Sequence, residues 1–257
     1  MKWIAVAIIL TFTLIVSSGC GQENKANSSK ELTISAAASL KDSMMEIAKA
    51  YKSQHPDSQL DFNFGGSGTL RQQIAQGAPV DLFLAASESD VNALVANKKI
   101  ISDTATPFLG NVLVLIAPKQ SDTKDLKSLI QEKKRLAIAT PKAAPAGDYA
   151  KEALTHLNLW KDAQENLVYG KDVRHVLTLV EEKSVEGGIV YNSDALVSNK
   201  VKVVEKVNPT AYSSIIYDAG VVSGSKQKTA AKAFLNYLQG TKAQQIFKKY
   251  GFASPKK

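Results

Sequence analysis

The chain alternates short apolar runs with amphipathic segments, and this alternation is the feature that most constrains its fold. An apolar run at residues 32–38 is followed by helical spacing of apolar residues at 39–53. The same two patterns then repeat along the chain with short connections. Strands that alternate with helices imply a mostly parallel sheet covered by helices, and the length allows two such units. The sequence therefore predicts an α/β protein of two lobes. Further strands are expected at residues 60–64, 81–86, 112–117, 136–139, 188–191, 201–207 and 215–222, and further helices at 69–76, 88–98, 126–132, 148–157, 173–182, 229–238 and 242–250.

The first 30 residues carry an export signal and a polar tether. An apolar stretch at residues 4–16 is too short to span a bilayer and is typical of a signal peptide. Small residues then lead into Cys20, the only cysteine, and this resembles the lipobox of bacterial lipoproteins, although Ser17 stands where that box usually has leucine. We expect residues 1–20 to be a lipoprotein signal peptide, Cys20 to carry lipid and residues 21–30 to be flexible. The alternative is an ordinary secretory signal that happens to contain a cysteine. Under either interpretation the protein works outside the cytoplasmic membrane, and lipidation would anchor it to the outer face of that membrane.

The formal net charge of +8 comes from lysines spread along the whole chain. These basic residues are not interleaved with aromatic residues, and the chain carries an export signal, so nucleic-acid binding is not expected. A solvated basic surface is the favoured interpretation. Long-range attraction of an anion is a weaker one.

Signals for catalysis and for metal binding are weak. The histidines His55, His156 and His175 are far apart and form no ligand pair at helical spacing. The sequence has no nucleophile elbow, zinc-protease motif or phosphate-binding loop of the nucleotidases. Ser67 between two glycines invites a serine-hydrolase interpretation, but nothing in the sequence places a base beside it. Asp194 is expected to cap a short helix. We therefore expect neither an enzyme nor a cofactor.

Four segments place small or hydroxylated residues where a strand or loop turns into a helix. A helix N-terminus carries unpaired N–H groups and partial positive charge, so it binds oxyanions without a cationic side chain. Taken singly, each segment is explained by helix capping, because Ser39, Ser67 and Asp172 are ordinary N-cap types. Four together, two in each half of the chain, favour an oxyanion site. The segments are residues 36–40, 65–70, 145–149 and 171–174.

The same segments carry a resemblance that extends over nearly the whole chain after the tether. The motifs are Ala-Ala-Ala-Ser-Leu at 36–40, Gly-Ser-Gly-Thr-Leu at 66–70, Gly-Ala-Pro-Val-Asp-Leu-Phe at 77–83, Leu-Gly-Asn at 109–111, Pro-Ala-Gly-Asp-Tyr-Ala-Lys-Glu-Ala-Leu at 145–154, Asp-Val-Arg at 172–174, Gly-Ile-Val-Tyr at 188–191 and Ile-Phe-Lys-Lys-Tyr-Gly-Phe at 246–252. In this order they resemble the molybdate-binding proteins of bacterial molybdate ABC transporters, in the periplasmic-binding-protein superfamily.

The resemblance implies a fold of two lobes, each with a mixed, mostly parallel sheet, with two crossover strands as the hinge and an oxyanion held between the lobes. It places lobe 1 at residues 31–110 and 215–257, and lobe 2 at residues 111–214. It implies that Ser39 and Ser67 bind through their hydroxyls and backbone N–H groups. Ala146 and Val173 would contribute backbone N–H groups, and Tyr191 its hydroxyl. Molybdenum would enter only as molybdate, through these residues.

The function expected from the resemblance is capture of molybdate, and of tungstate as well, by a monomeric lipoprotein that delivers the ion to an ABC permease. Uncharged donors suffice for a dianion when helix termini are aimed at it. Three alternatives remain open. They are a binding protein for sulfate or another tetrahedral oxyanion, a secreted serine hydrolase that uses Ser67, and a surface adhesin or signalling receptor with the same lobes.

Overall fold

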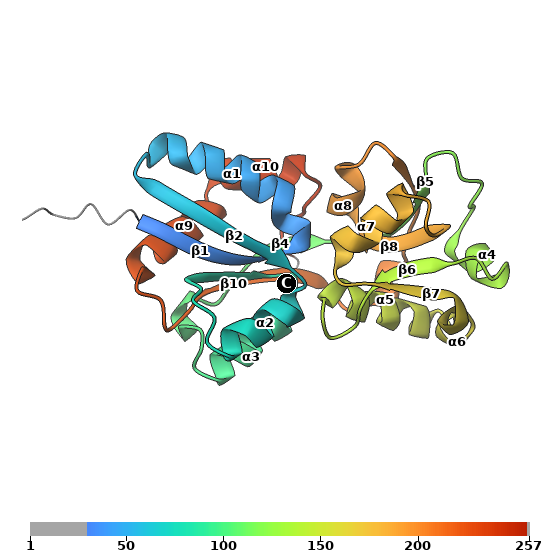
Figure 1. Ribbon diagram of the computed structural model, residues 1–257, viewed down its shortest axis with the longest axis horizontal. Coiled ribbons are helices and arrows are strands. Elements are labelled where there is room, and N and C mark those ends of the chain that lie inside the picture. Colours follow the sequence, from blue (N-terminus) through green and yellow to red (C-terminus); the bar gives the residue numbers. More distant parts are fainter. Residues whose placement is uncertain (1–29, 256–257) are drawn as a thin grey trace, which may run out of the picture.

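The computed structural model describes residues 30–255, and these form two α/β lobes that lie side by side (Figure 1). The signal peptide, the lipidation of Cys20 and residues 21–29 of the tether lie outside the described residues. Within the described part of the chain, no helix is long and apolar enough to cross a bilayer.

Each lobe is built around one five-stranded sheet. The strand order is β2-β1-β3-β10-β4 in the first lobe and β7-β6-β8-β5-β9 in the second. The first sheet contains β1 (Lys30–Ala37), β2 (Ser58–Gly65), β3 (Leu82–Ala85), β4 (Thr106–Asn111) and β10 (Ile215–Val221). The second contains β5 (Leu113–Pro118), β6 (Leu136–Ala139), β7 (Leu167–Gly170), β8 (Gly187–Tyr191) and β9 (Val201–Lys206).

The two sheets repeat one pattern of strand directions. In the first, β1 pairs in parallel with β2 and β3, whereas β10 runs antiparallel to β3 and β4. In the second, β6 pairs in parallel with β7 and β8, whereas β5 runs antiparallel to β8 and β9. The chain changes lobes from β4 to β5 and again from β9 to β10. The predicted two-lobed α/β class is confirmed. The pairing is evenly mixed rather than mostly parallel, because the strands at the two crossings run against their neighbours.

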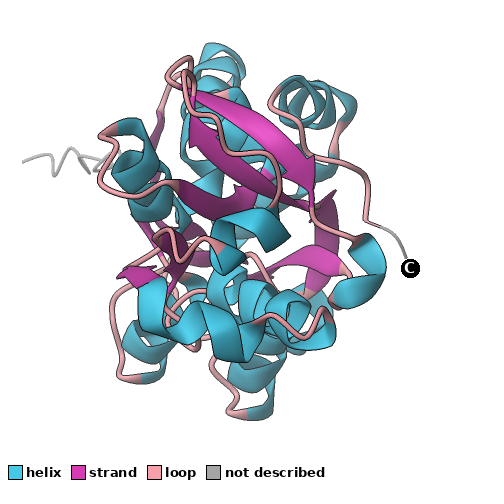
Figure 2. Cartoon of the chain, turned by 90° about the vertical axis from the view of Figure 1, so that its right-hand side faces the viewer, coloured by secondary structure: helices cyan, strands magenta, loops and turns pink. Residues whose placement is uncertain are grey.

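Helices cover both faces of each sheet, which is also seen from the end of the second lobe (Figure 2). Their apolar spacing explains why they pack there: α1 buries Met44, Ile47 and Tyr51 on one face. Burying one such side chain contributes about 1.5–3 kcal/mol. The helices of the first lobe are α1 (Lys41–Gln54), α2 (Ser67–Ala75), α3 (Glu88–Ala96), α9 (Lys228–Gln239) and α10 (Thr241–Lys249). Those of the second are α4 (Leu126–Gln131), α5 (Pro145–His156), α6 (Trp160–Ala163), α7 (Val173–Glu181) and α8 (Asn192–Leu196).

The structure corrects several expected elements. The strand β7 and the short helix α6 were not predicted. Three of the four residues of β7 are at least partly exposed, and the four residues of α6 are too few to show a helical period. Helix α5 begins at Pro145 rather than at residue 148, since proline is well suited to the first helical position. As a result Ala146 lies in the first turn of a helix. Ser39 lies in a 3₁₀ turn, Ala38–Leu40, that precedes α1.

Candidate functional site

One cavity between the lobes brings together all five residues that the resemblance singles out. Ser39 and Ser67 line it from the first lobe, and Ala146, Val173 and Tyr191 line it from the second. The cavity has about 200 Å³ of empty space, part of which is open to solvent. The two lobes therefore approach each other closely around one small cavity. The remaining lining residues are Ala37, Ala38, Gly65, Gly66, Ala86, Ala144 and Asp172.

Three α-helices begin at this cavity. Helix α2 begins with Ser67, α5 has Ala146 as its second residue, and α7 begins with Val173. The first N–H groups of a helix have no partner inside it, and the helix dipole gives that end partial positive charge. Asp172 caps α7, but its carboxylate accepts from the N–H of His175 and does not occupy that of Val173. The three helix ends therefore favour an anion in the cavity.

The hydroxyl of Ser67 has its direction set by the backbone. The N–H of Ala86 donates to Ser67 Oγ over 2.9 Å. A backbone N–H can only donate, so the serine oxygen accepts in this contact and keeps its own proton for another partner. Ser67 is buried and lines the cavity, so a ligand there can receive that proton.

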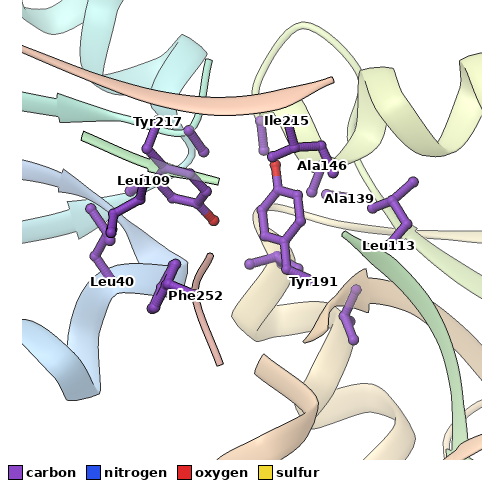
Figure 3. Packing of buried hydrophobic residues seen from close by; sticks show 14 of the residues in the cluster. Leu40, Leu109, Leu113, Ala139, Ala146, Tyr191, Ile215, Tyr217 and Phe252 are labelled. Atoms are coloured by element: carbon purple, nitrogen blue, oxygen red, sulfur yellow. The ribbon is translucent and has the colours of Figure 1, made fainter. Parts of the chain in front are cut away.

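The hydroxyl of Ser39 contacts a tyrosine outside the lining. Ser39 Oγ lies 2.8 Å from Tyr217 Oη, on strand β10. The rings of Tyr217 and Tyr191 pack edge-on across the boundary between the lobes, with their centroids 5.9 Å apart (Figure 3). The sequence did not single out Tyr217, because in a strand pattern it reads only as an apolar residue.

Tyr191 is the residue of the cavity whose side chain most clearly lacks a hydrogen-bond partner. Its side chain is 1% exposed, and its hydroxyl has no hydrogen-bond partner among the described residues. Leaving a buried hydroxyl unpaired costs about 1–3 kcal/mol. Burial also raises the pKa of Tyr191 well above its usual value, so the hydroxyl keeps its proton and remains a donor. The hydroxyl therefore has a proton to donate at the wall of the cavity but no acceptor. An anion in the cavity would supply that acceptor.

Formal charge is distributed around the cavity rather than in it. Among the residues that line it, the only charged one is Asp172. A basic pocket shares Ala38 and Asp172 with the cavity and carries Lys41, Lys171 and Arg174. A second pocket is acidic, because Glu88, Asp90, Asp148 and Glu152 line it together with only two basic residues, Arg71 and Lys142. An approaching anion is therefore attracted at the basic pocket and repelled at the acidic one.

The closed arrangement is supported by close contacts between the lobes. The N–H of Thr69 donates to the carbonyl of Ala143 over 3.0 Å. The two glycines beside Ser67 pack directly on the same loop of the second lobe. A Cβ on Gly66 would lie 2.4 Å from the Ala143 oxygen, and one on Gly68 would lie 2.0 Å from the oxygen of Lys142. The abundance of glycine in this turn, visible in the sequence, is explained by this approach of the lobes.

Arg174 makes a further contact between the lobes, and it corrects the interpretation of Asp194. Its guanidinium pairs with Asp42 at the start of α1, in the first lobe. Its Nε also lies 2.8 Å from Asp194 Oδ1. Asp194 is fully buried within α8 and is not the N-cap of that helix, which is Tyr191. Burial raises the pKa of Asp194 to about 7, against the opposing effect of Arg174. A local capping pattern could not reveal a charge partner 20 residues away.

The chemistry that this arrangement supports is binding of an anion by neutral donors. Asp172 and Tyr191 are the titratable side chains in the lining, and Asp172 is occupied as a helix cap. No lining residue is a histidine, lysine or glutamate that would activate Ser67 as a nucleophile. Within residues 30–255 there is also no group of three or more metal-ligating side chains.

Two α/β lobes joined by two crossings, with a small cavity lined by helix N-termini between them, define the class of two-lobed solute-binding proteins. The chain belongs to the family described as bacterial extracellular solute-binding protein, whose profile matches residues 32–253.

Relatives over the same length agree with this assignment. The molybdate-binding protein ModA of Escherichia coli is 40% identical over 229 residues, which cover 86% of this chain and 88% of ModA. A Bacillus subtilis protein, YvgL, carries the provisional name of ABC transporter substrate-binding lipoprotein and is 41% identical over 98% of this chain and 97% of its own length. Among solved structures, the substrate-binding domain of a provisionally assigned molybdenum ABC transporter from Clostridium difficile is 40% identical, covers 88% of this chain and 99% of its own, and has a TM-score of 0.69. The resemblance to molybdate-binding proteins is thus confirmed, and the chain is a substrate-binding protein of the ABC-transporter type.

Proposed function

We propose that the protein captures molybdate between its lobes, accepts tungstate in the same way, and delivers the ion to an ABC permease. The single observation that carries the proposal is the buried hydroxyl of Tyr191, which has no partner among the described residues and lies at a small cavity lined by helix N-termini. The ModA proteins of E. coli and Haemophilus influenzae, at 40% and 36% identity, support the choice of ion.

Binding would proceed by closure of the two lobes. The first lobe offers the hydroxyls of Ser39 and Ser67, and the second offers the N–H groups of Ala146 and Val173 with the hydroxyl of Tyr191. An ion bound to one lobe loses its remaining water when the other closes over it. Every oxygen of the ion must then find a donor, because an unmatched charge in a dry cavity is costly. Neutral donors and helix dipoles would hold the charge without a cationic side chain.

Selection among oxyanions would depend on size. Sulfate, molybdate and tungstate share one charge and one shape, so a site of uncharged donors distinguishes them by the room that it leaves. The backbone contacts of Gly66 and Gly68 limit how far the lobes can approach each other, and they thereby limit that room.

The protein would work outside the cytoplasmic membrane as a monomer. The family is one of extracellular proteins, and the name of YvgL includes the word lipoprotein. Lipid on Cys20 would hold the molecule at the outer face of the membrane, near its permease.

Elemental analysis tests the identity of the ion. The protein is incubated with equal concentrations of molybdate, tungstate, sulfate and phosphate, passed through a desalting column and analysed by mass spectrometry. Molybdenum and tungsten together should approach one ion per protein, without bound phosphate. Retention of phosphate, or sulfate that excess molybdate fails to displace, would contradict the proposal.

Calorimetry tests the site. Ser39→Ala and Ser67→Ala should each weaken molybdate binding by about 1–3 kcal/mol, the cost of a hydrogen bond to a charged group. Ser43→Ala is the matched control, because Ser43 is equally buried but donates to the carbonyl of Leu40 within its own helical segment. An unchanged affinity in both site variants would reject the site.

A further inference from the structure

Tyr217 occupies a central position behind the cavity wall. It lies on β10, the strand by which the chain returns to the first lobe, and its side chain is fully buried. Its ring packs edge-on against Phe108, Tyr191 and Phe252, with centroid distances of 6.4, 5.9 and 5.4 Å. The ring is therefore held firmly, and its hydroxyl has a fixed place.

That hydroxyl connects the cavity to the crossing between the lobes. On one side Tyr217 Oη lies 2.8 Å from Ser39 Oγ, in the cavity lining. On the other it lies 3.4 Å from Nδ2 of Asn111, the last residue of β4. The same amide nitrogen lies 2.9 Å from the Oγ of Ser193, in α8 of the second lobe.

The directions of these hydrogen bonds can be derived. Asn111 Oδ1 accepts from the N–H of Val112 over 2.9 Å, so the amide nitrogen is the atom that faces Tyr217. An amide nitrogen only donates, and Tyr217 Oη therefore accepts from it. Among the described residues, the recorded acceptor for the proton of Tyr217 is Ser39 Oγ. Burial raises the pKa of Tyr217 far above its usual value, so this proton is retained. Ser39 then accepts from the tyrosine, and its own proton is left for the cavity.

We propose that Tyr217 is a positioning residue of the anion site: oriented by Asn111, it donates to Ser39 Oγ and so aims the single proton of Ser39 at the bound anion. This inference rests on the proposed function. Ser67 receives the equivalent constraint from the N–H of Ala86. Both serine hydroxyls of the first lobe are thus oriented as donors before the anion binds, so less side-chain conformational entropy is lost on binding.

The test is a double-mutant cycle measured by calorimetry with molybdate. Tyr217→Phe keeps the packed ring and removes the hydroxyl, so molybdate should bind about tenfold more weakly, as expected for one misdirected hydrogen bond. In a Ser39→Ala background, the same change should have almost no further effect, because no serine proton remains to be aimed. A role of Tyr217 in folding alone would give the same loss in both backgrounds.

Tyr212→Phe is the control. Tyr212 is also buried near the crossing, and its hydroxyl accepts from the N–H of Leu113 over 3.0 Å without contact to the serines. Its loss should leave affinity within about twofold, since no donor of the site depends on it. Thermal unfolding without ligand checks that each variant is folded.

The outcomes separate the inference from the function on which it rests. Wild-type affinity in Tyr217→Phe, or equal losses with and without the hydroxyl of Ser39, would overturn the positioning role while molybdate binding stands. If the wild-type protein binds no molybdate, both proposals are overturned.

Discussion

Replacing Gly68 by alanine should block closure of the lobes without harming either lobe. Gly68 is the second residue of α2, and its φ lies outside the left-handed region. Alanine is the better helix former, so the first lobe alone should tolerate the change or gain stability. In the closed arrangement, however, the new Cβ would lie 2.0 Å from the backbone oxygen of Lys142 in the other lobe.

The expected loss of affinity for molybdate follows from the contacts that this clash would break. An ordinary contact begins near 3.4 Å, so the lobes must separate locally by about 1.4 Å. The 3.0 Å bond from the Thr69 N–H to the Ala143 carbonyl would then be lost, at about 0.5–1.5 kcal/mol. At least one donor from the second lobe would leave hydrogen-bond distance of the anion, at about 1.5–3 kcal/mol. The sum, about 2–4.5 kcal/mol, corresponds to a dissociation constant about 30-fold to 1,600-fold higher.

The assay is calorimetric titration with molybdate, combined with thermal unfolding of the ligand-free protein. Gly224→Ala is the control, because a Cβ there meets nothing within 4 Å and its φ is also ordinary. The control should bind as the wild type does. If Gly68→Ala binds molybdate within twofold of the wild type, then binding does not require this approach of the lobes, and the reasoning fails.

Two further predictions concern charge. The pKa of Asp194 is raised by burial to about 7 from its usual 3.8, so the folded protein holds this proton more tightly than the unfolded chain. Its contribution to stability is present below about pH 4 and is lost as the pH rises to about 7, with a slope of up to about 1.4 kcal/mol per pH unit. In urea unfolding between pH 5 and 8, Asp194→Asn should flatten this decline, and an unchanged slope would disprove the assignment. The second prediction is that changing Lys41 and Lys171 together to glutamine lowers the association rate of molybdate several-fold at low salt and little at high salt. Stopped-flow measurements would show this, and an equal loss in the control with both Lys98 and Lys99 changed to glutamine would mean that only net charge matters.

The parts of the fold that follow from local periodicity could be predicted from the sequence. The run that forms β1 and the spacing that forms α1 each extend over at least eight residues, enough to show a period. Strand β7 has four residues, three of them at least partly exposed, and shows none. A mixed, mostly parallel sheet was expected in each lobe, and the antiparallel share was underestimated because local patterning does not encode the direction in which a strand joins its sheet.

The candidate site could be predicted only in part from the sequence, for a related reason. Turn and capping chemistry located the segments that carry Ser39 and Ser67, and the structure brings these segments to one cavity. The hydrogen bond from Tyr217 to Ser39 joins residues 178 positions apart, so no local pattern could reveal it. The ion pair of Arg174 with the buried Asp194 depends in the same way on the packing of α7 against α8. The individual roles of the site residues in holding an anion stay predictions.

A crystal structure of the protein with molybdate, with data collected at the molybdenum absorption edge, would test the central claim most directly. The account predicts one anomalous peak in the cavity, with the oxygens of the ion about 3 Å from the hydroxyls of Ser39, Ser67 and Tyr191 and from the N–H groups of Ala146 and Val173. An empty cavity, or molybdate held instead by the side chains of the basic pocket, would contradict it.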